Sequence, residues 1–431
     1  MTAAELLTAI KTRLSLTGTY HDNLITALAE DVKQYITSAG ANAESDAAVG
    51  VIARGVADLW NFGSGDGKFS EVFYQRVTQL ALVKPETKQN IKKIKPYLYE
   101  ITFNHVDYQA AADYFKKYKP LIGGCSAVSN GNLFGRNYDW KYEERVEFIV
   151  HTPANEGRHS VIGVAAGTPD LTQEFIDNGG YSPNINIVPF MLLDGINDAG
   201  LICEINVAPT GDKGITRGTN PNKEDLFAMM ITRYVLDYAG SVDEAITLLN
   251  NRNVFCANSE EMEQEFHFML ADANKTVVIE FIDNELKVIN EFVNDKPIVT
   301  NFYLYGYDGT RESLTDYAMG IERQAILNDN YSMSDTELGM IGLMNKVQYT
   351  KAYSENENPL WYSEFCGGEL TKDSPASDYA EIMAAARNEF SHRQRDGKTW
   401  QTVHCSVYNR AEKKLAIIPQ ESGQIINFYL N

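Results

Sequence analysis

Residues 121–140, with the sequence LIGGCSAVSNGNLFGRNYDW, contain the feature that most constrains the fold of this chain. Two apolar-rich runs flank Asn130-Gly131, and an Asn-Gly pair in that position strongly predicts a β-hairpin, because both central residues of a type I′ turn need a positive φ. A two-residue turn there would place Cys125 opposite Arg136, with Asp139 just beyond the paired region. A cation beside a cysteine lowers the pKa of the thiol. The hairpin therefore predicts a reactive site as well as two strands.

Two glycines stand directly before this cysteine. Glycine leaves the preceding peptide bond free of side chains and tolerates strained backbone. Attack of the Cys125 thiol on the Gly124 carbonyl would release a new N-terminus, whose α-amine has a reference pKa of about 7.7–8.0 and suits a general base near neutral pH. The ordinary alternative is a loop followed by a small buried strand residue. Arg136 and Asp139 at pairing distance favour the catalytic interpretation.

The segment GCSAVSNGNLFGRNYDW resembles the start of the mature chain in choloylglycine hydrolases and their relatives, the linear amide C–N hydrolases. The relatives include bile salt hydrolases, penicillin V acylases, and the acid ceramidase and N-acylethanolamine amidase group. All are N-terminal-nucleophile (Ntn) hydrolases that cut linear amide bonds. The resemblance implies that Cys125 is the nucleophile and that Arg136 and Asp139 lie beside it.

Two later segments extend the resemblance over roughly residues 90–431. DGINDAGLICEINVAP is similar to a turn of the family and its following strand, which places Asn206 at an active-site asparagine. VTNFYL is similar to the segment with the second asparagine, here Asn301. The resemblance therefore implies that both asparagines belong to the active site.

A second catalytic arginine is also implied, because bile salt hydrolases carry one before a late strand, here TVHCSVYN. Arg393 and Arg395 lie in the corresponding region, and Arg311 is a third candidate by analogy with the ceramidase branch. Spacing does not decide among them, so this role stays unassigned.

The chemistry that we expect is acyl transfer through a thioester. The freed amine of Cys125 accepts the thiol proton, directly or through water, and the sulfur attacks the amide carbon of the substrate. Negative charge on the carbonyl oxygen needs fixed donors, which Asn206 and Asn301 could supply. Asp139 would hold the α-amine, Arg136 would orient the nucleophile, and water would hydrolyse the thioester.

Two other functions stay open. A papain-like cysteine–histidine pair would use one of the seven histidines, of which His404 is the best placed, although no papain-type sequence surrounds the cysteine. A function of a different class is a phage structural or interaction protein whose hydrolase-like domain is inert. Each partner also has an ordinary interpretation, with Arg136 and Asp139 as a structural ion pair and Asn206 and Asn301 as strand-end residues.

Composition limits the partners. With 38 basic and 58 acidic residues, the formal net charge is −20, which argues against binding nucleic acid or anionic membranes through bulk electrostatics. No apolar run is long enough to span a membrane, and the N-terminal MTAAELLTAIKTRL lacks the apolar core of a signal peptide. The five cysteines are scattered without CxxC spacing, so neither a zinc site nor a disulfide framework is expected.

We therefore expect a cytoplasmic enzyme that uses no cofactor and no metal. Its expected partner is a small N-acyl amide substrate. Assembly of two fragments after self-cleavage and formation of a homo-oligomer stay open, and the sequence does not identify the acyl group or the amine.

Three domains are expected. Residues 1–83 have apolar positions at helical spacing, interrupted at residues 61–67. Within them, DLWNFGSGDGKFSEVFYQRVTQLAL resembles the small helical head–tail connector proteins of tailed phages. We interpret this module as a natural or engineered fusion; a chance match by a helical propeptide and a phage-borne two-function protein are the alternatives. Residues 84–124 are expected to form a helical pro-segment and residues 125–431 the Ntn-hydrolase domain.

Strand-like runs predominate after residue 125, with helices between them. This pattern predicts an α+β chain with a layered α/β/β/α sandwich, which the resemblance also implies. The expected helices are residues 223–239, 241–250, 317–327 and 376–389. The expected strands are residues 148–151, 160–165, 201–207, 266–270, 276–281, 298–301, 402–408 and 415–419.

Overall fold

The computed structural model of the chain describes residues 3–39, 41, 43, 48–62, 69–82, 91–117, 125–141, 146–155, 157–180, 182–208, 222–255, 265–282, 285–307, 320–347, 349–352, 360–361, 399–419 and 424–430. The chain divides into two compact units, Met1–Asn90 and Ile91–Asn431. Each unit has a hydrophobic core of its own.

Helices form the first unit: α1 (Ala3–Leu14), α2 (Asp22–Ser38), α3 (Val49–Phe62) and α4 (Glu71–Leu82). The apolar positions at helical spacing lie on the buried faces, as Val32 of α2 and Val56 of α3 illustrate. The helical prediction for this part of the chain is confirmed for the described residues. The resemblance to phage connector proteins stays a prediction.

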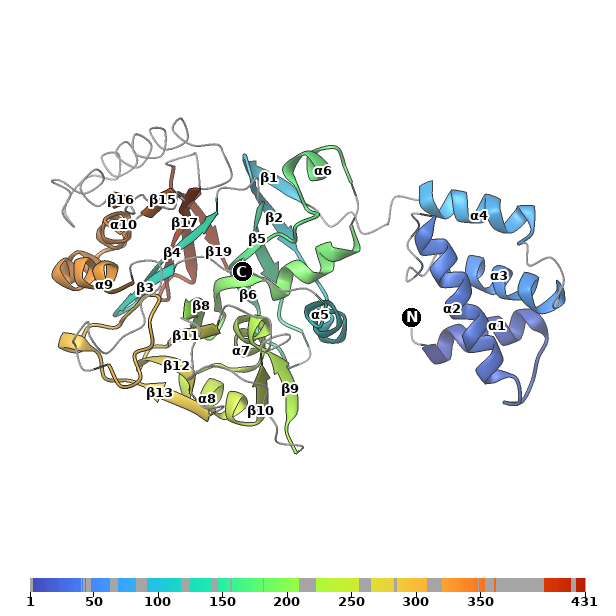
Figure 1. The fold of residues 1–431 in the computed structure, drawn as a ribbon, viewed down its shortest axis with the longest axis horizontal. Coiled ribbons are helices and arrows are strands. Elements are labelled where there is room, and N and C mark those ends of the chain that lie inside the picture. The colour runs from blue at the N-terminus through green and yellow to red at the C-terminus, as the bar shows by residue number, and fades with distance from the viewer. Residues whose placement is uncertain are drawn as a thin grey trace. The chain divides into compact units, whose positions relative to one another are not determined.

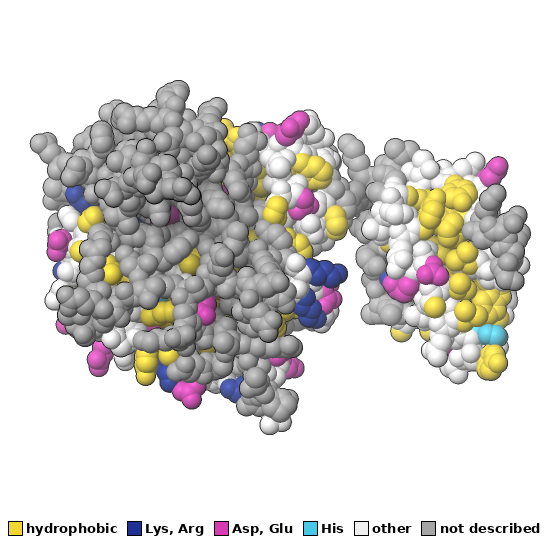
Figure 2. All heavy atoms as spheres, viewed as in Figure 1, with side chains coloured by type: hydrophobic (Ala, Val, Ile, Leu, Met, Phe, Trp, Pro, Cys, Tyr) yellow, Lys and Arg dark blue, Asp and Glu magenta, His cyan; other side chains and the backbone are white. Residues whose placement is uncertain are grey.

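Some large apolar side chains of this unit are exposed. Tyr20 and Leu24 have exposed fractions of 92% and 53%. Figure 2 shows hydrophobic side chains gathered in a band on the visible face of the unit. The unit therefore presents apolar as well as charged surface to its surroundings.

A nine-stranded sheet forms one of the two central layers of the second unit, with the order β1-β2-β5-β6-β7-β8-β11-β12-β13 (Figure 1). Neighbouring strands are antiparallel except for the parallel pair β2 and β5. The strands are β1 (Lys92–Lys95), β2 (Leu98–Thr102), β5 (Glu147–Thr152), β6 (Val161–Ala166), β7 (Leu192–Asn197), β8 (Ile202–Ala208), β11 (Glu265–Ala271), β12 (Thr276–Ile282) and β13 (Glu285–Ile289).

The second central layer is an eight-stranded sheet with the order β14-β3-β4-β17-β15-β16, in which β18 pairs with β17 and β19 pairs with β18. The strands are β3 (Cys125–Asn130), β4 (Leu133–Lys141), β14 (Ile298–Val299), β15 (Tyr349–Ala352), β16 (Leu360–Trp361), β17 (Thr399–Asn409), β18 (Lys414–Pro419) and β19 (Ile426–Tyr429). A separate parallel pair joins β9 (Glu224–Phe227) to β10 (Arg252–Phe255).

Helices cover the outer faces of both sheets. The nine-stranded sheet packs against the short helices α5 (Tyr108–Phe115) and α6 (Gln173–Asp177), the 3-10 segments η2 (Pro183–Phe190) and η3 (Ala228–Met230), and the helices α7 (Ile231–Tyr238) and α8 (Val242–Asn250). The eight-stranded sheet packs against α9 (Gly320–Asp329), η6 (Tyr331–Asp335) and α10 (Glu337–Asn345). A further core cluster fills the space between the sheets. The α/β/β/α sandwich predicted from the sequence is therefore confirmed.

Two predictions about local structure are wrong. Residues 92–102 of the expected helical pro-segment form β1 and β2, because the apolar side chains of Leu98, Tyr99 and Ile101 are buried in the nine-stranded sheet. The expected helix at residues 223–239 begins only at Ile231, since the preceding residues form β9 and η3. The expected helix at residues 376–389 lies outside the described residues.

The predicted hairpin forms, but its register differs by two residues. Gly131 and Asn132 form the turn, and only Gly131 has a positive φ (54°), as expected for a type II′ turn. Cys125 therefore pairs with Tyr138, and Arg136 pairs with Ala127. Because side chains alternate between faces with a period of two, this shift leaves the cysteine and the arginine on one face of the sheet.

The first unit offers a matched test of its packing within one helix. A Cβ at Gly55 would lie 2.6 Å from Phe73 and 2.7 Å from Val32, whereas a Cβ at Gly50 would meet nothing within 4 Å. We expect Gly55→Ala to destabilise the unit by about 1–3 kcal/mol through overpacking. Gly50→Ala should stabilise it by up to about 1 kcal/mol through higher helix propensity.

Amide hydrogen exchange of α3 peptides in the full chain measures both effects. Exchange should be faster than wild type in the first variant and unchanged or slower in the second. Equal exchange in the two variants would contradict the packing described here.

Candidate active site

Cys125 is the first residue of β3 and faces the space between the sheets. The Arg136 Nη2 donates a hydrogen bond to its Sγ at 3.1 Å, and both side chains are fully buried. Arg136 also donates to the backbone oxygen of Ile205 and forms ion pairs with Asp194 at 3.0 Å and Glu204 at 3.2 Å. The predicted pairing of thiol and guanidinium is therefore present, across a diagonal of the hairpin.

The electrostatic effect of this pairing differs from the sequence prediction. Burial raises the pKa of the Cys125 thiol to about 12, and the Arg136 guanidinium offsets only part of this rise. Desolvation outweighs the nearby cation because the thiolate has lost its contact with water. In the intact chain the thiol is therefore protonated near neutral pH.

Asp139 lies near the main chain of the cysteine. It accepts hydrogen bonds from the Thr402 hydroxyl at 2.6 Å and from Arg323 Nη1 at 3.0 Å. The same Nη1 donates to the backbone oxygen of Cys125 at 2.8 Å. Burial raises the pKa of Asp139 to about 6, although Arg323 and Thr402 act in the opposite direction.

Asn301 follows β14 and contacts the backbone nitrogen of Cys125. The backbone nitrogen of Cys125 donates to Asn301 Oδ1 at 2.8 Å, and Arg323 Nη2 donates to the same oxygen. The Asn301 Nδ2 donates to the Val207 backbone oxygen at 2.7 Å. This asparagine thus links the nucleophile strand to β8 of the other sheet.

Asn206 lies on β8, directly after the residue whose carbonyl accepts from Arg136. Its side chain is fully buried, and neither its Oδ1 nor its Nδ2 has a hydrogen-bond partner among the described residues. Buried amides are usually satisfied, so this unsatisfied amide is a candidate to bind a ligand. The role predicted for Asn206 therefore stays a prediction.

Sequence reasoning missed Arg323 of α9, which contacts Cys125, Asp139 and Asn301. The three arginines considered for a second active-site arginine, at positions 311, 393 and 395, lie outside the described residues. The sequence does contain a signal for a buried Arg323, because the residues three and four positions before and after it are apolar or small: Met319, Gly320, Ile326 and Leu327. A charged residue on an apolar helix face is rarely left unpaired when buried.

The geometry disfavours a cysteine–histidine pair. His404 Nδ1 lies 2.5 Å from Glu147, and its Nε2 lies 3.8 Å from Asp194. Burial lowers the pKa of His404, but the two carboxylates raise it by more than burial lowers it, and the resulting pKa is about 9. The imidazole is therefore protonated at neutral pH and cannot accept the thiol proton.

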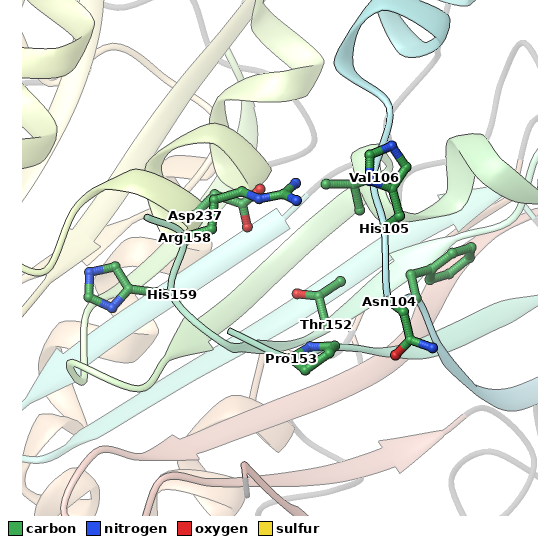
Figure 3. A pocket seen from close by; sticks show the side chains of 9 residues that line it. Asn104, His105, Val106, Thr152, Pro153, Arg158, His159 and Asp237 are labelled. Carbon is green, nitrogen blue, oxygen red and sulfur yellow. The ribbon is translucent and has the colours of Figure 1, made fainter. Parts of the chain in front are cut away.

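A surface pocket lies apart from these residues. Thr152, Arg158, His159 and Asp237 are among the side chains that line it (Figure 3). It includes none of the five predicted catalytic residues. Among the described helices, none combines the length and the apolar character needed to cross a membrane.

A four-layer sandwich whose inner strand begins with a buried cysteine is the arrangement expected of the Ntn-hydrolase class. One family model, described as "Acyl-coenzyme A:6-aminopenicillanic acid acyl-transferase", matches residues 127–423. This match spans more than half of the chain, and the chain belongs to that family. This match confirms the recognition of an Ntn-hydrolase family from the sequence.

Solved structures similar to this chain include two variants of the conjugated bile acid hydrolase from Clostridium perfringens. Each is 15% identical and covers 72% of this chain and 92% of its own, with TM-scores of 0.38 and 0.39. Penicillin V acylase from Agrobacterium tumefaciens is 13% identical, with coverage of 71% and 86% and a TM-score of 0.34. Among curated proteins, no significant relative of this sequence is found.

The raised pKa of Cys125 predicts slow alkylation of the intact chain. At pH 7.5 a thiol of pKa about 12 has a thiolate fraction roughly 10³-fold lower than an ordinary cysteine. Iodoacetamide labelling, located by peptide mass spectrometry, should therefore be slow at pH 7.5 and faster as the pH rises. Rapid labelling of Cys125 in folded, uncleaved protein at neutral pH would contradict this electrostatic account.

Removing the Arg323 side chain should strongly destabilise the fold. Arg323→Ala leaves the buried Asp139 carboxyl without its cation, and breaking such a pair costs about 3–5 kcal/mol. The loss in unfolding free energy should be smaller at pH 5 than at pH 8. At pH 5 the Asp139 carboxyl is largely neutral, because its pKa is raised to about 6, so it needs the cation less. Urea unfolding measures both values.

Arg158→Ala is the matched control, since this arginine is only partly buried and lines the surface pocket. Its unfolding free energy should differ from that of wild type by no more than about 0.5 kcal/mol. Similar losses in the two variants would show that Arg323 has no special structural role.

Proposed function

We propose that the chain is an amidohydrolase that cuts linear N-acyl amides through a thioester on Cys125, after autocatalytic cleavage at Gly124–Cys125. The observation that supports this most is that polar groups converge on the main chain of Cys125. Its nitrogen donates to Asn301, and its oxygen accepts from Arg323. Buried main-chain groups need partners in any protein, and here the partner of the nitrogen, Asn301, would also be in place to hold the α-amine that cleavage creates.

The chemistry follows from these contacts. Cleavage would convert the Cys125 nitrogen into an α-amine beside Asn301, with Asp139 and Arg323 fixing its surroundings. The amine would take the thiol proton, and the sulfur would attack the amide carbon. The unsatisfied Asn206 amide is available to donate to the oxyanion, where one such donor is worth about 2.7–4 kcal/mol.

Membership of the family supports the transfer of an acyl group from the substrate to the Cys125 sulfur. Water would complete the hydrolysis of the thioester, with the amine of the substrate as the first product. A small N-acyl amide is therefore the proposed substrate, and cytoplasmic localisation stays part of the proposal. The proposal does not depend on residues 1–83.

Intact-mass measurement of purified protein tests the cleavage. Wild type should give fragments 1–124 and 125–431, and Cys125→Ala should remain whole because its side chain cannot attack Gly124. Cys405→Ala is the matched control, since Cys405 is equally buried on β17, and it should cleave like wild type.

Activity then tests the amidase. Cleaved wild type should release amine from a panel of N-acyl amides, and Cys125→Ala should be at least about 10³-fold slower, as for removal of a catalytic nucleophile. A wild-type chain that neither cleaves nor releases amine would favour the alternative of an inert hydrolase-like domain.

A further inference from the structure

Self-cleavage of the intact chain needs a proton acceptor that the mature enzyme would not need. Before cleavage, the Cys125 nitrogen is an amide that donates to Asn301, so it cannot accept the thiol proton. His404 is already protonated. Both oxygens of Asp139 accept hydrogen bonds, from Thr402 and Arg323. These groups are therefore poorly suited to begin the reaction.

Glu204 of β8 differs from them in its position. Its Oε2 accepts from Arg136 Nε at 3.2 Å, and Arg136 Nη2 donates to the Cys125 sulfur at 3.1 Å. The Nε and Nη2 groups form one edge of a guanidinium, so a single edge holds the carboxyl group and the thiol next to each other. Asp194 binds the Nη1 group of the same arginine instead.

The second oxygen of this carboxyl group is unsatisfied. Glu204 is fully buried, and its Oε1 has no hydrogen-bond partner among the described residues. A buried carboxyl oxygen without a partner is energetically costly, and a catalytic role is one explanation for its presence. Glu204 therefore has an acceptor oxygen without a partner among the described residues, on a carboxyl group that binds the same guanidinium edge as the Cys125 thiol.

We propose that Glu204 accepts the Cys125 thiol proton during self-cleavage and returns it to the departing nitrogen. This inference rests on the proposed self-cleavage. The proton moves from sulfur to the carboxylate while a bond forms between Sγ and the Gly124 carbonyl carbon. The bond from that carbon to the Cys125 nitrogen then breaks, and Glu204 protonates the nitrogen. A thioester and a free amine result, and water hydrolyses the thioester to the Gly124 carboxylate and the thiol.

The ionisation of Glu204 is compatible with this role. Burial raises its pKa to about 7, while Arg136 and His267 act in the opposite direction and Asp194 adds to the rise. Both forms of the carboxyl are thus populated near neutral pH, which suits a group that first accepts and then donates a proton. Transfer from a thiol of pKa about 12 is uphill at rest, so it must accompany formation of the sulfur–carbon bond.

A neutral residue in place of Glu204 should still allow the chain to fold, because burial favours the neutral form of this carboxyl group. Its pKa is higher in the folded than in the unfolded chain, so the stability that the protonated group contributes is full below pH 4.5 and is lost as the pH rises through about 7. Glu204→Gln keeps the shape without the charge, and Arg136 keeps its partner Asp194. Thermal unfolding and circular dichroism check that the variant is folded.

The test follows cleavage of freshly synthesised full-length chain over time between pH 5.5 and 9. In wild type, the rate should rise with pH and level off above an inflection near 7. Glu204→Gln should cleave at least about 10²-fold more slowly and without that inflection. Glu204→Asp should recover part of the rate, because it restores a carboxyl group. Hydroxylamine, which intercepts the thioester, separates its formation from its hydrolysis.

Asp194→Asn is the matched control, since it removes the other carboxylate from the same guanidinium. It should keep an inflection, moved to lower pH, because Asp194 no longer adds to the rise in the pKa of Glu204. Equal loss of rate and inflection in both variants would assign the effect to charge balance at Arg136 and overturn the inference. Wild-type behaviour of Glu204→Gln would also overturn it and leave the proposed function standing. A wild type that does not cleave even with hydroxylamine would refute self-cleavage and this inference together.

Discussion

The buried guanidinium of Arg136 is the interaction on which the rest of the site depends. A cation taken out of water between two sheets is tolerated only when anionic and polar partners surround it. Asp194 and Glu204 provide the charge, and the Cys125 sulfur and a backbone oxygen both accept from Nη2. These partners come from β3, β7 and β8, so the arginine on β4 joins the two sheets where the nucleophile lies.

A second buried arginine acts on the opposite end of the cysteine. Arg136 contacts the thiol, whereas Arg323 contacts the main-chain oxygen and, through Asn301, the main-chain nitrogen. One arginine belongs to a strand and the other to a covering helix. The position of Cys125 is therefore fixed from both sides of β3, and neither arginine can replace the other because they bind different atoms.

The sequence predicted the layers and the hairpin, since these depend on apolar patterns and on local turn chemistry. It also singled out Arg136 and Asn301, which contact Cys125. It misplaced the hairpin turn by one residue, because Gly131 alone supplies the positive φ. It gave the wrong sign for the pKa of Cys125, because a neighbouring cation can be read from a strand register but the loss of water cannot. Arg323 and the strands β1 and β2 were missed since their roles depend on distant partners.

The parallel pairing of β2 with β5 has a consequence for the chain after a cut at Gly124–Cys125. β2 precedes the cut and β5 follows it, yet they share backbone hydrogen bonds and a buried layer that includes Tyr99 and Phe148. The cut would therefore turn one polypeptide into a heterodimer of interlocked subunits that dilution does not separate. The helical unit would stay attached through an interface made during folding, and denaturation would be needed to release it.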